Sequence, residues 1–295
     1  MSNSPEHITV IKPKQGLLDI DWSELWRFRE LFFFLVWRDV KVKYKQSALG
    51  ALWAIIVPFV QMVIFTLLFS NVANLPTDGV HPQIFYYSGL LIWTYFATAL
   101  TFASNSLVHS KNILTKIYFP RLIMPSAPAL AALVDFAIAF SILIIMMIYY
   151  QTAISFAILL MPLFVLMAML TATGTGLMFS ALNVKYRDIG FALPFISQIW
   201  MYGTVIVPYS KIPDSWGFWK YVYALNPMAG AVEGFRWCML HLNLKTTRMI
   251  DSKIVSFPVE FPWELIGLGI ASMLVIFILG LWYFRKMEDT FADIV

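Results

Sequence analysis

Six long apolar stretches constrain the fold of this chain more than any other feature. They cover roughly residues 49–71, 84–106, 123–150, 155–182, 190–209 and 263–284. A helix needs about 20 apolar residues to cross the hydrocarbon core of a bilayer, and each stretch reaches that length. Only 13% of the 295 residues are charged, against about 25% in soluble domains. The sequence therefore predicts an all-α integral membrane protein with six transmembrane helices.

The positions of Lys and Arg predict that both termini are cytoplasmic. Eight of these residues precede or lie near the start of the first span, and seven more lie in the second loop, the fourth loop and the C-terminal tail. The first loop, residues 71–83, and the third loop, near Gln151, contain none. Short cytoplasmic loops carry the excess of Lys and Arg, whereas long loops such as the fifth are partly exempt from this rule.

Residues 22–48 predict an amphipathic helix that lies along the cytoplasmic membrane surface. The segment WSELWRFRELFFFLVW is rich in aromatic residues, and a basic patch of Arg38, Lys41, Lys43 and Lys45 follows it. Helices at the headgroup boundary combine such apolar and cationic groups. We expect a polar N-terminal tail over residues 1–21, a transmembrane domain over 49–284 and a cytoplasmic tail over 285–295.

The segment between the fifth and sixth spans, residues 210–262, is too apolar and aromatic in its first half for a solvated loop. Pro213, Gly217, Pro227 and Gly230 break it into short pieces. Two short re-entrant helices fit this pattern, because non-helical backbone at membrane depth must be buried in protein or line a cavity. A hairpin of interfacial helices is the alternative. Residues 243–262 are expected to form an external polar excursion.

Sequence motifs for catalysis or nucleotide binding are missing. The chain contains no G-x-x-x-x-G-K-[ST] phosphate loop, no H-E-x-x-H metal motif and no G-x-S-x-G elbow. A single cysteine, Cys238, excludes a disulfide within the chain and a metal site built on cysteines. We therefore expect no cofactor or metal in this chain, and the small net charge of +4 does not favour nucleic acid as a partner.

Two features inside the predicted spans are chemically distinctive. Asp135 lies near the middle of the third span, where an ionisable residue is a functional candidate. The alternative is that its carboxyl group is protonated or hydrogen-bonded to a neighbouring helix. In the fourth span, the small residues from Thr171 to Gly176 predict a close approach of two helices.

Several separated segments together resemble a known family. They are RDVKVKYKQSALGALWAIIVPFVQMVIFTLLF, YYSGLLIWTYFATAL, NSLVHSKNILTKIYFPRLIMP, LNVKYRDIGFALPFISQIWMYGTVIVPY, YALNPMAGAVEGFRW and FRKMEDTFADIV. In this order they resemble the membrane permease subunit of bacterial polysaccharide exporters of the ABC-2 type. The resemblance covers the chain from Trp22 to Val295.

The resemblance implies a homodimer in the bacterial inner membrane that is bound to two copies of a separate ABC ATPase subunit, which holds ATP and Mg. The implied substrate is a lipid-linked polysaccharide, with O-antigen as the first choice and capsular polysaccharide or teichoic acid as alternatives. An ABC-2 exporter of a drug or small lipid shares the fold. An integral membrane transferase is a further alternative, although the acidic residues are dispersed.

The resemblance also implies which residues contact the ATPase. The loop from Ser110 to Arg121 matches the coupling helix, residues 184–190 form a second cytoplasmic contact, and the N-terminal helix adds a third. The expected coupling residues are Ser110, Lys111, Asn112, Lys116, Arg121, Lys185, Arg187, Asp188, Glu24, Arg27 and Glu30. The alternatives are ordinary positive charge on cytoplasmic loops and a helix that only anchors the chain.

A glycan conduit is expected to present aromatic rings, on which the C–H faces of sugars pack. The candidates are Trp53, Tyr86, Tyr87, Trp93, Tyr95, Phe96, Tyr202, Tyr209 and Tyr223. The alternative is that these residues belong to the aromatic belts at the membrane interfaces or pack inside the bundle.

Overall fold

The computed structural model describes residues 22–45, 49–110, 119–250 and 253–288. Its helices are α1 (Trp22–Arg27), α2 (Arg29–Lys45), α3 (Leu52–Phe65), α4 (Pro82–His109), α6 (Ile123–Tyr149), α7 (Met161–Lys185), α8 (Ile189–Val205), α9 (Phe218–Ala224), α10 (Pro227–Leu240) and α11 (Trp263–Glu288). A π-helical segment, Thr66–Val72, prolongs α3, and a 3₁₀ turn, Phe156–Leu160, leads into α7. Strands β1 (Lys245–Ile250) and β2 (Lys253–Pro258) precede α11.

Five helices in the described part of the chain are long and apolar enough to cross a membrane, which confirms an integral membrane protein. They cover Leu52–Val72, Pro82–His109, Ile123–Tyr149, Phe156–Lys185 and Trp263–Glu288. The helix at the predicted fifth span, α8, is apolar but has only 17 residues. It ends at Val205, whereas the predicted span extended to Tyr209. The chain then continues through Pro208, whose ring removes a backbone hydrogen-bond donor.

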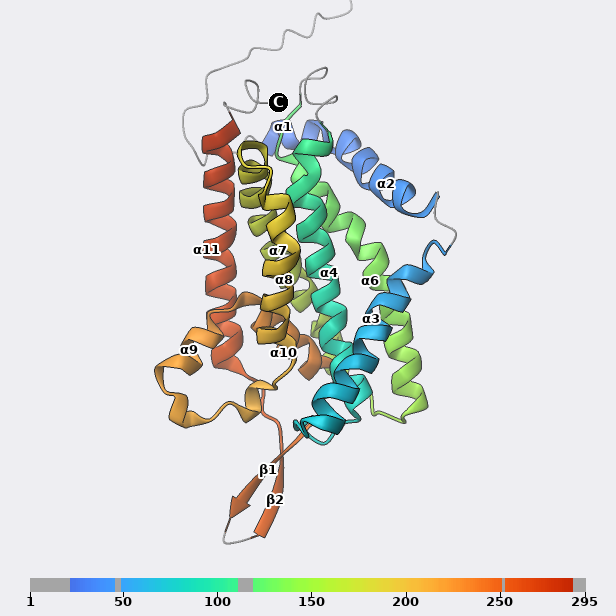
Figure 1. The fold of residues 1–295 in the computed structure, drawn as a ribbon, viewed down its shortest axis with the longest axis vertical. Helices are drawn as coiled ribbons and strands as arrows, with labels where there is room; N and C mark the ends of the chain where they lie inside the picture. The colour runs from blue at the N-terminus through green and yellow to red at the C-terminus, as the bar shows by residue number, and fades with distance from the viewer. Residues whose placement is uncertain (1–21, 46–48, 111–118, 251–252, 289–295) are drawn as a thin grey trace, which may run out of the picture.

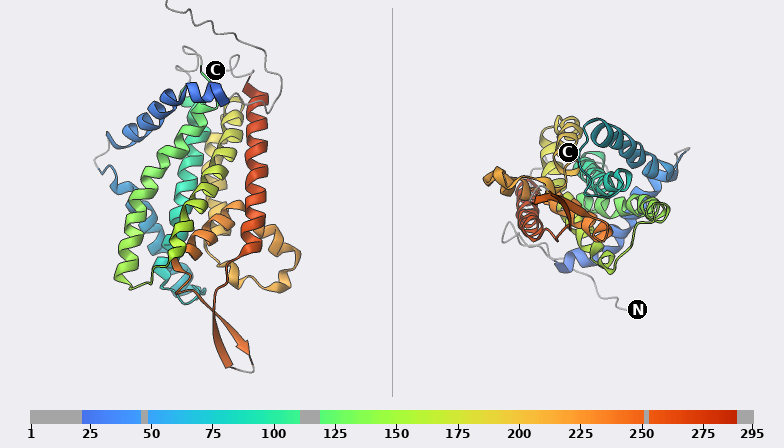
Figure 2. Two further views of the ribbon diagram at one scale, coloured as in Figure 1. Left: turned by 180° about the vertical axis from the view of Figure 1, so that it is seen from behind. Right: turned by 90° about the horizontal axis from the view of Figure 1, so that it is seen from below.

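Helix α4 forms the centre of the bundle and packs between α6 and α7 (Figures 1 and 2). Most of its side chains are buried over the whole length of the helix. The hydroxyl groups of Tyr87 and Tyr95 donate hydrogen bonds of 3.0 Å to the carbonyl oxygens of Ala139 and Ala129 on α6. These bonds satisfy the hydroxyl groups of both rings, so that Tyr87 and Tyr95 can be buried in the bundle.

Helices α7 and α11 approach each other so closely that only glycine fits at the contact. A Cβ atom at Gly174 would lie 2.6 Å from the Cα of Phe277, and one at Gly280 would collide with the backbone of Gly174. A Cβ atom at Gly176 would lie 2.6 Å from the Cβ of Ala103 on α4. The close helix approach that the small residues of this segment predict is therefore confirmed.

One end of the bundle is covered by α1 and α2, and we call it the α2 end (Figure 1). Backbone hydrogen bonds at Phe28 and Phe32 continue the helical pattern from α1 into α2. Leu35 is 1% exposed and packs in a cluster with Leu107 of α4 and Phe284 of α11. Large aromatic side chains on other faces stay exposed, namely Trp26, Phe33, Phe34 and Trp37. This division suits a helix at a membrane surface.

The opposite end, which we call the hairpin end, holds α9, α10 and the β-hairpin (Figures 1 and 2). Strands β1 and β2 pair antiparallel, from Lys245 opposite Pro258 to Ile250 opposite Lys253. Within a mostly helical fold, residues 243–262, which we expected to form an external polar excursion, thus contain a two-stranded sheet that the prediction did not include. The sequence KIVSFP of β2 is rich in β-branched and aromatic residues, which favour strands. It lies outside the six apolar stretches that predict membrane-spanning helices.

The glycine contact between α7 and α11 leads to a stability prediction. Replacement of Gly280 by Val places a branched side chain against the backbone of Gly174, and overpacking of this kind costs about 1–3 kcal/mol. We expect a lower melting temperature for the purified protein in detergent. Gly267→Val is the matched control on the same helix, because a Cβ atom there meets nothing within 4 Å. Equal melting temperatures for the two variants would contradict the prediction.

Candidate functional site

Two adjoining cavities lie along α4, where α3, α6 and α8 leave part of its surface uncovered. One has a volume of about 180 Å³ and the other about 320 Å³. Both are lined by Lys43, Val57, Thr94 and Thr98. We call them together the α4 groove. Figure 1 shows α3 and α8 on either side of α4.

The larger cavity of the α4 groove has a partly polar lining, whereas the smaller one is mostly apolar. The neutral polar side chains of the groove are threonine, serine and glutamine, namely Gln61, Thr94, Thr98, Thr101, Ser197 and Gln198. The Oε1 atom of Gln61 and the Oγ1 atom of Thr94 are buried without a hydrogen-bond partner in the described part of the chain. A buried polar atom without a partner costs about 1–3 kcal/mol, so these atoms favour a ligand or water that offers hydrogen bonds.

A charged pair closes the α4 groove on the side of α2. The Nζ of Lys43 forms an ion pair with a carboxylate oxygen of Asp135, and the hydroxyl group of Tyr44 donates a hydrogen bond to the other oxygen. Lys43 also lies over the ring of Phe102, 5.6 Å from its centroid. The side chain of Asp135 is 15% exposed and that of Lys43 is 35% exposed. The acid in the third predicted span is therefore held by two side chains of the surface helix α2.

The structure divides the predicted conduit aromatics into three groups. Trp53 and Tyr95 line the smaller cavity of the α4 groove and Trp93 the larger one. Trp53 is 50% exposed, whereas Trp93 and Tyr95 are buried. Tyr202 is exposed next to the groove, where its hydroxyl group accepts a hydrogen bond of 3.1 Å from Nε2 of Gln198.

The second group, Tyr86, Tyr87 and Phe96, is fully buried in the core. Tyr86 packs edge-on against Phe65, and Phe96 packs in the same manner against Trp200. The third group, Tyr209 and Tyr223, lies at the hairpin end, where the two rings stack with centroids 6.3 Å apart. A conduit role for each of these residues stays a prediction, and the geometry gives Trp53 and Tyr202 the most accessible rings.

The described coupling residues lie on elements that meet at the α2 end (Figure 1). Arg27, Glu30, Lys185, Arg187 and Asp188 are exposed, and Glu24 is half-buried. Ser110 is buried at the C-terminus of α4. Arg121 donates a hydrogen bond to the backbone carbonyl of Glu288, which ties the start of α6 to the end of α11. Lys111, Asn112 and Lys116 lie outside the described residues.

A buried ion pair in α10 is a feature that sequence reasoning missed. Arg236 is 1% exposed, forms an ion pair with Glu233, and donates a hydrogen bond of 3.1 Å to the carbonyl of Val205. Its guanidinium group also lies 3.7 Å from the ring centroid of Phe85. Burial raises the pKa of the Glu233 carboxyl, and the Arg236 guanidinium opposes this rise. Their spacing of three residues in an apolar segment is the signal that could have indicated the pair.

The comparison with family models identifies the architecture. The model of the ABC-2 type transporter matches residues 30–240, from α2 to the end of α10. This chain belongs to the ABC-2 type transporter family. The matched segment includes all the residues that line the α4 groove, whereas the β-hairpin and α11 lie outside it. The resemblance that the sequence motifs indicate is thereby confirmed.

Curated relatives within this family carry a more specific name. A protein of Myxococcus xanthus, "O-antigen export system permease protein RfbA", is 27% identical over 219 residues, which cover 72% of this chain and 81% of that protein. A protein of Klebsiella pneumoniae with the same name is 24% identical over 268 residues, which cover 90% of this chain and 95% of that protein. This ABC-2 permease therefore aligns with these relatives over most of its length.

The ion pair at the groove leads to a prediction for this ABC-2 permease. Replacement of either partner leaves the other charge without its counterion, and a hydrogen bond to a charged group contributes about 1.5–3 kcal/mol to stability. We expect Lys43→Met and Asp135→Asn each to lower the melting temperature, and the double variant to lose much less than the two losses combined. Such non-additivity is the sign of a direct contact. The control is Lys45→Met, which replaces an exposed lysine two residues further along α2. Fully additive losses in the double variant would contradict the assignment.

Proposed function

We propose that this chain is the transmembrane subunit of an ATP-driven exporter that moves a lipid-linked polysaccharide across the inner membrane. The α4 groove is the observation that carries this proposal, because it places hydroxyl and amide side chains along apolar helices. A hydroxyl-rich polymer needs hydrogen-bond partners to pass the hydrocarbon region, since an unsatisfied polar group there costs several kcal/mol. O-antigen is our first choice, because the relatives from both organisms are named for O-antigen export.

The exporter is proposed to be a homodimer. In one chain the larger cavity of the α4 groove is lined by residues of α2, α3, α4 and α8, and Figure 1 shows α4 between α3 and α8. A second copy, related by twofold symmetry, would bring an equivalent groove to face the first, as isologous dimers do. Such a pair would enclose a conduit that shields the polymer from lipid. In this arrangement Trp53 and Tyr202 would offer their rings to passing sugars.

The energy is proposed to come from a separate ABC ATPase subunit, two copies of which hold ATP and Mg. The sequence has no phosphate loop of its own. The α2 end would then be cytoplasmic and the hairpin end external, in agreement with the distribution of Lys and Arg. In this topology α8 is the fifth of six spans, and α9 and α10 are short re-entrant helices. Arg27, Glu30, Lys185 and Arg187 would contact the ATPase.

A substitution in the α4 groove tests the proposed conduit. Thr98 lines both cavities, so Thr98→Trp fills the groove with a large ring. We expect export of the polymer to the cell surface to fall by more than roughly tenfold, which corresponds to a barrier higher by about 1.4 kcal/mol. Ala271→Trp on α11 is the control, because Ala271 is exposed on another helix and does not line the groove.

The export assay is made in cells from which the native permease gene has been deleted, with surface polysaccharide as the readout. Equal export by the Thr98→Trp and Ala271→Trp variants would remove the conduit role of the groove. Purification of the tagged protein gives a second measurement, because an ATPase subunit should copurify and hydrolyse ATP. A chain that transfers or hydrolyses a substrate alone would instead favour the transferase alternative.

The coupling loop has a test of its own. Charge reversal by Lys111→Glu and Lys116→Glu should uncouple ATP hydrolysis from export, while membrane insertion and expression stay normal. The measurement compares ATPase activity of the purified complex with export in cells. The control is Lys245→Glu, an exposed residue at the hairpin end that does not line the pocket there, and it should leave coupling intact. Normal export by the double variant would remove the coupling assignment.

A further inference from the structure

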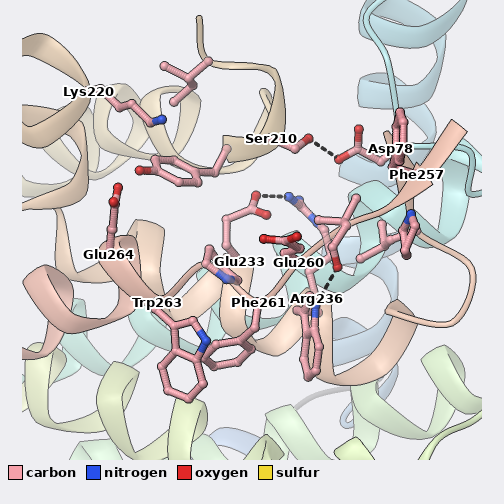
Figure 3. A pocket seen from close by; sticks show the side chains of 17 residues that line it. Asp78, Ser210, Lys220, Glu233, Arg236, Phe257, Glu260, Phe261, Trp263 and Glu264 are labelled. Carbon is pink, nitrogen blue, oxygen red and sulfur yellow. Dashed lines mark hydrogen bonds and ion pairs between the residues drawn. The ribbon is translucent and has the colours of Figure 1, made fainter. Parts of the chain in front are cut away.

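Another cavity, separate from the two that form the α4 groove, opens at the hairpin end of the molecule. Its volume is about 610 Å³, within the range of about 300–1,000 Å³ for sites that bind small molecules. Segments distant in sequence meet there: the loop before α4, the turn after α8, α9, α10, β2 and the start of α11. We call it the hairpin pocket (Figure 3). Its part from Phe257 to Glu264 lies outside the segment that the family model matches.

One wall of the hairpin pocket is built from charges that neutralise each other. Glu233 pairs with the buried Arg236. Asp78, with 3% of its side chain exposed, lies 3.5 Å from Nζ of Lys211 and accepts a hydrogen bond of 2.6 Å from the hydroxyl group of Ser210. Interactions of buried charges with several partners fix side chains in place. This wall is therefore rigid and prearranged.

The other wall offers aromatic rings and carboxylates to the solvent. Trp263 is 76% exposed, and its ring lies 4.4 Å from that of Phe261, which in turn packs edge-on against Trp237 at 4.8 Å. Glu260 and Glu264 flank these rings and are exposed. Figure 3 shows the carboxyl groups of Glu233 and Glu260 near the middle of the pocket, with the rings of Phe261 and Trp263 beside them.

The combination of an exposed tryptophan ring and a rigid polar wall favours some classes of ligand over others. A metal ion is not favoured, because the described residues contain no cluster of three or more His, Cys, Asp or Glu side chains that could hold one. A flat apolar ligand would cover the exposed carboxylates of Glu260 and Glu264 without offering them hydrogen bonds. A sugar ring satisfies both walls, since its C–H face packs on an aromatic ring and its hydroxyl groups donate to carboxylate oxygens.

We propose that the hairpin pocket binds a single uncharged pyranoside ring, stacked on Trp263 and hydrogen-bonded by Glu260 and Glu264. Acidic sugars are disfavoured, because Asp78 is paired with Lys211 and Glu233 with Arg236, which leaves the carboxylates of Glu260 and Glu264 against the remaining lining cation Lys220. That the ring belongs to the exported polymer rests on the proposed function. The pocket then holds a sugar of the chain where it leaves the conduit.

The test uses saturation-transfer difference NMR, which detects weak binding, with the full-length protein in lipid nanodiscs. The probes are the methyl glycosides of glucose, galactose and mannose, together with methyl glucuronide, which differs from methyl glucoside by its carboxylate. We expect ring C–H signals from at least one neutral glycoside and none from the glucuronide. Trp263→Ala should weaken binding by roughly tenfold, the loss expected for about 1.4 kcal/mol.

Two further variants make the test specific. Trp219→Ala removes a similarly exposed tryptophan of α9 that does not line the pocket, and it should leave the signal unchanged. Glu260→Gln keeps the size of the side chain and removes its charge, so that methyl glucuronide should begin to bind. The proposal is overturned if no neutral glycoside binds, if Trp263→Ala and Trp219→Ala behave alike, or if the glucuronide binds to the unmodified protein as well as the glucoside does.

The outcomes for pocket and exporter can be told apart. Glycoside binding that depends on Trp263, in a protein that supports no polysaccharide export, would retain the pocket and overturn the proposed function. Export that proceeds normally in a protein without any glycoside binding would overturn the pocket alone. Reduced export by Trp263→Ala, with normal export by Trp219→Ala, would support the link between the pocket and the exported polymer.

Discussion

Every polar group inside this apolar bundle must find a partner within the protein, because lipid offers none. Helix α4 meets this constraint by several routes. Its hydroxyl side chains bond to carbonyl oxygens one turn back, as Thr101 does to Ala97 at 2.8 Å and Ser104 to Leu100 at 2.7 Å. Tyr87 and Tyr95 bond across to α6. Because many of the polar side chains of α4 are satisfied in these ways, the helix can occupy the centre, although the hydroxyl groups of Tyr86 and Thr94 have no hydrogen-bond partner in the described part of the chain.

Charges in the described part of the chain follow the same constraint, because the buried Arg236 and the largely buried Asp135 each have a counterion. Lys43 meets Asp135, and Arg236 meets Glu233. A buried ion pair adds little net stability over apolar packing, yet loss of one partner is strongly destabilising. Such pairs therefore fix how elements are arranged more than they strengthen the fold. The first fixes α2 against α6. The second lies within α10, and it is the hydrogen bond of Arg236 to the Val205 carbonyl and its contact with the ring of Phe85 that hold α10 against the end of α8 and α4.

The apolar pattern of the sequence predicts the long helices to within a few residues, because the thickness of the bilayer limits their length. The run from Thr171 to Gly176 likewise predicts the tight contact with α11. The sequence does not predict which distant residues pair with each other. Lys43 and Asp135 are 92 residues apart, and no local pattern links them. Nor does hydropathy tell which face of a helix is buried, so the sequence could not separate buried Tyr86 from exposed Tyr202. The burial of Arg236 is likewise hidden from the sequence, because it depends on the fold of α10 against α4.

The two cavities use polar groups in opposite ways, and this difference fits successive steps of transport. A conduit must bind its substrate well enough to admit it and weakly enough to release it. Apart from the Lys43–Asp135 pair at its α2 side, the α4 groove contains neutral hydroxyl and amide groups, each of which offers a modest hydrogen bond to a passing sugar. The hairpin pocket combines carboxylates with a stacking ring, which gives stronger bonds to donors. A polymer that moves from the groove to the pocket would thus meet sites of increasing affinity toward the hairpin end, and that gradient would oppose its return.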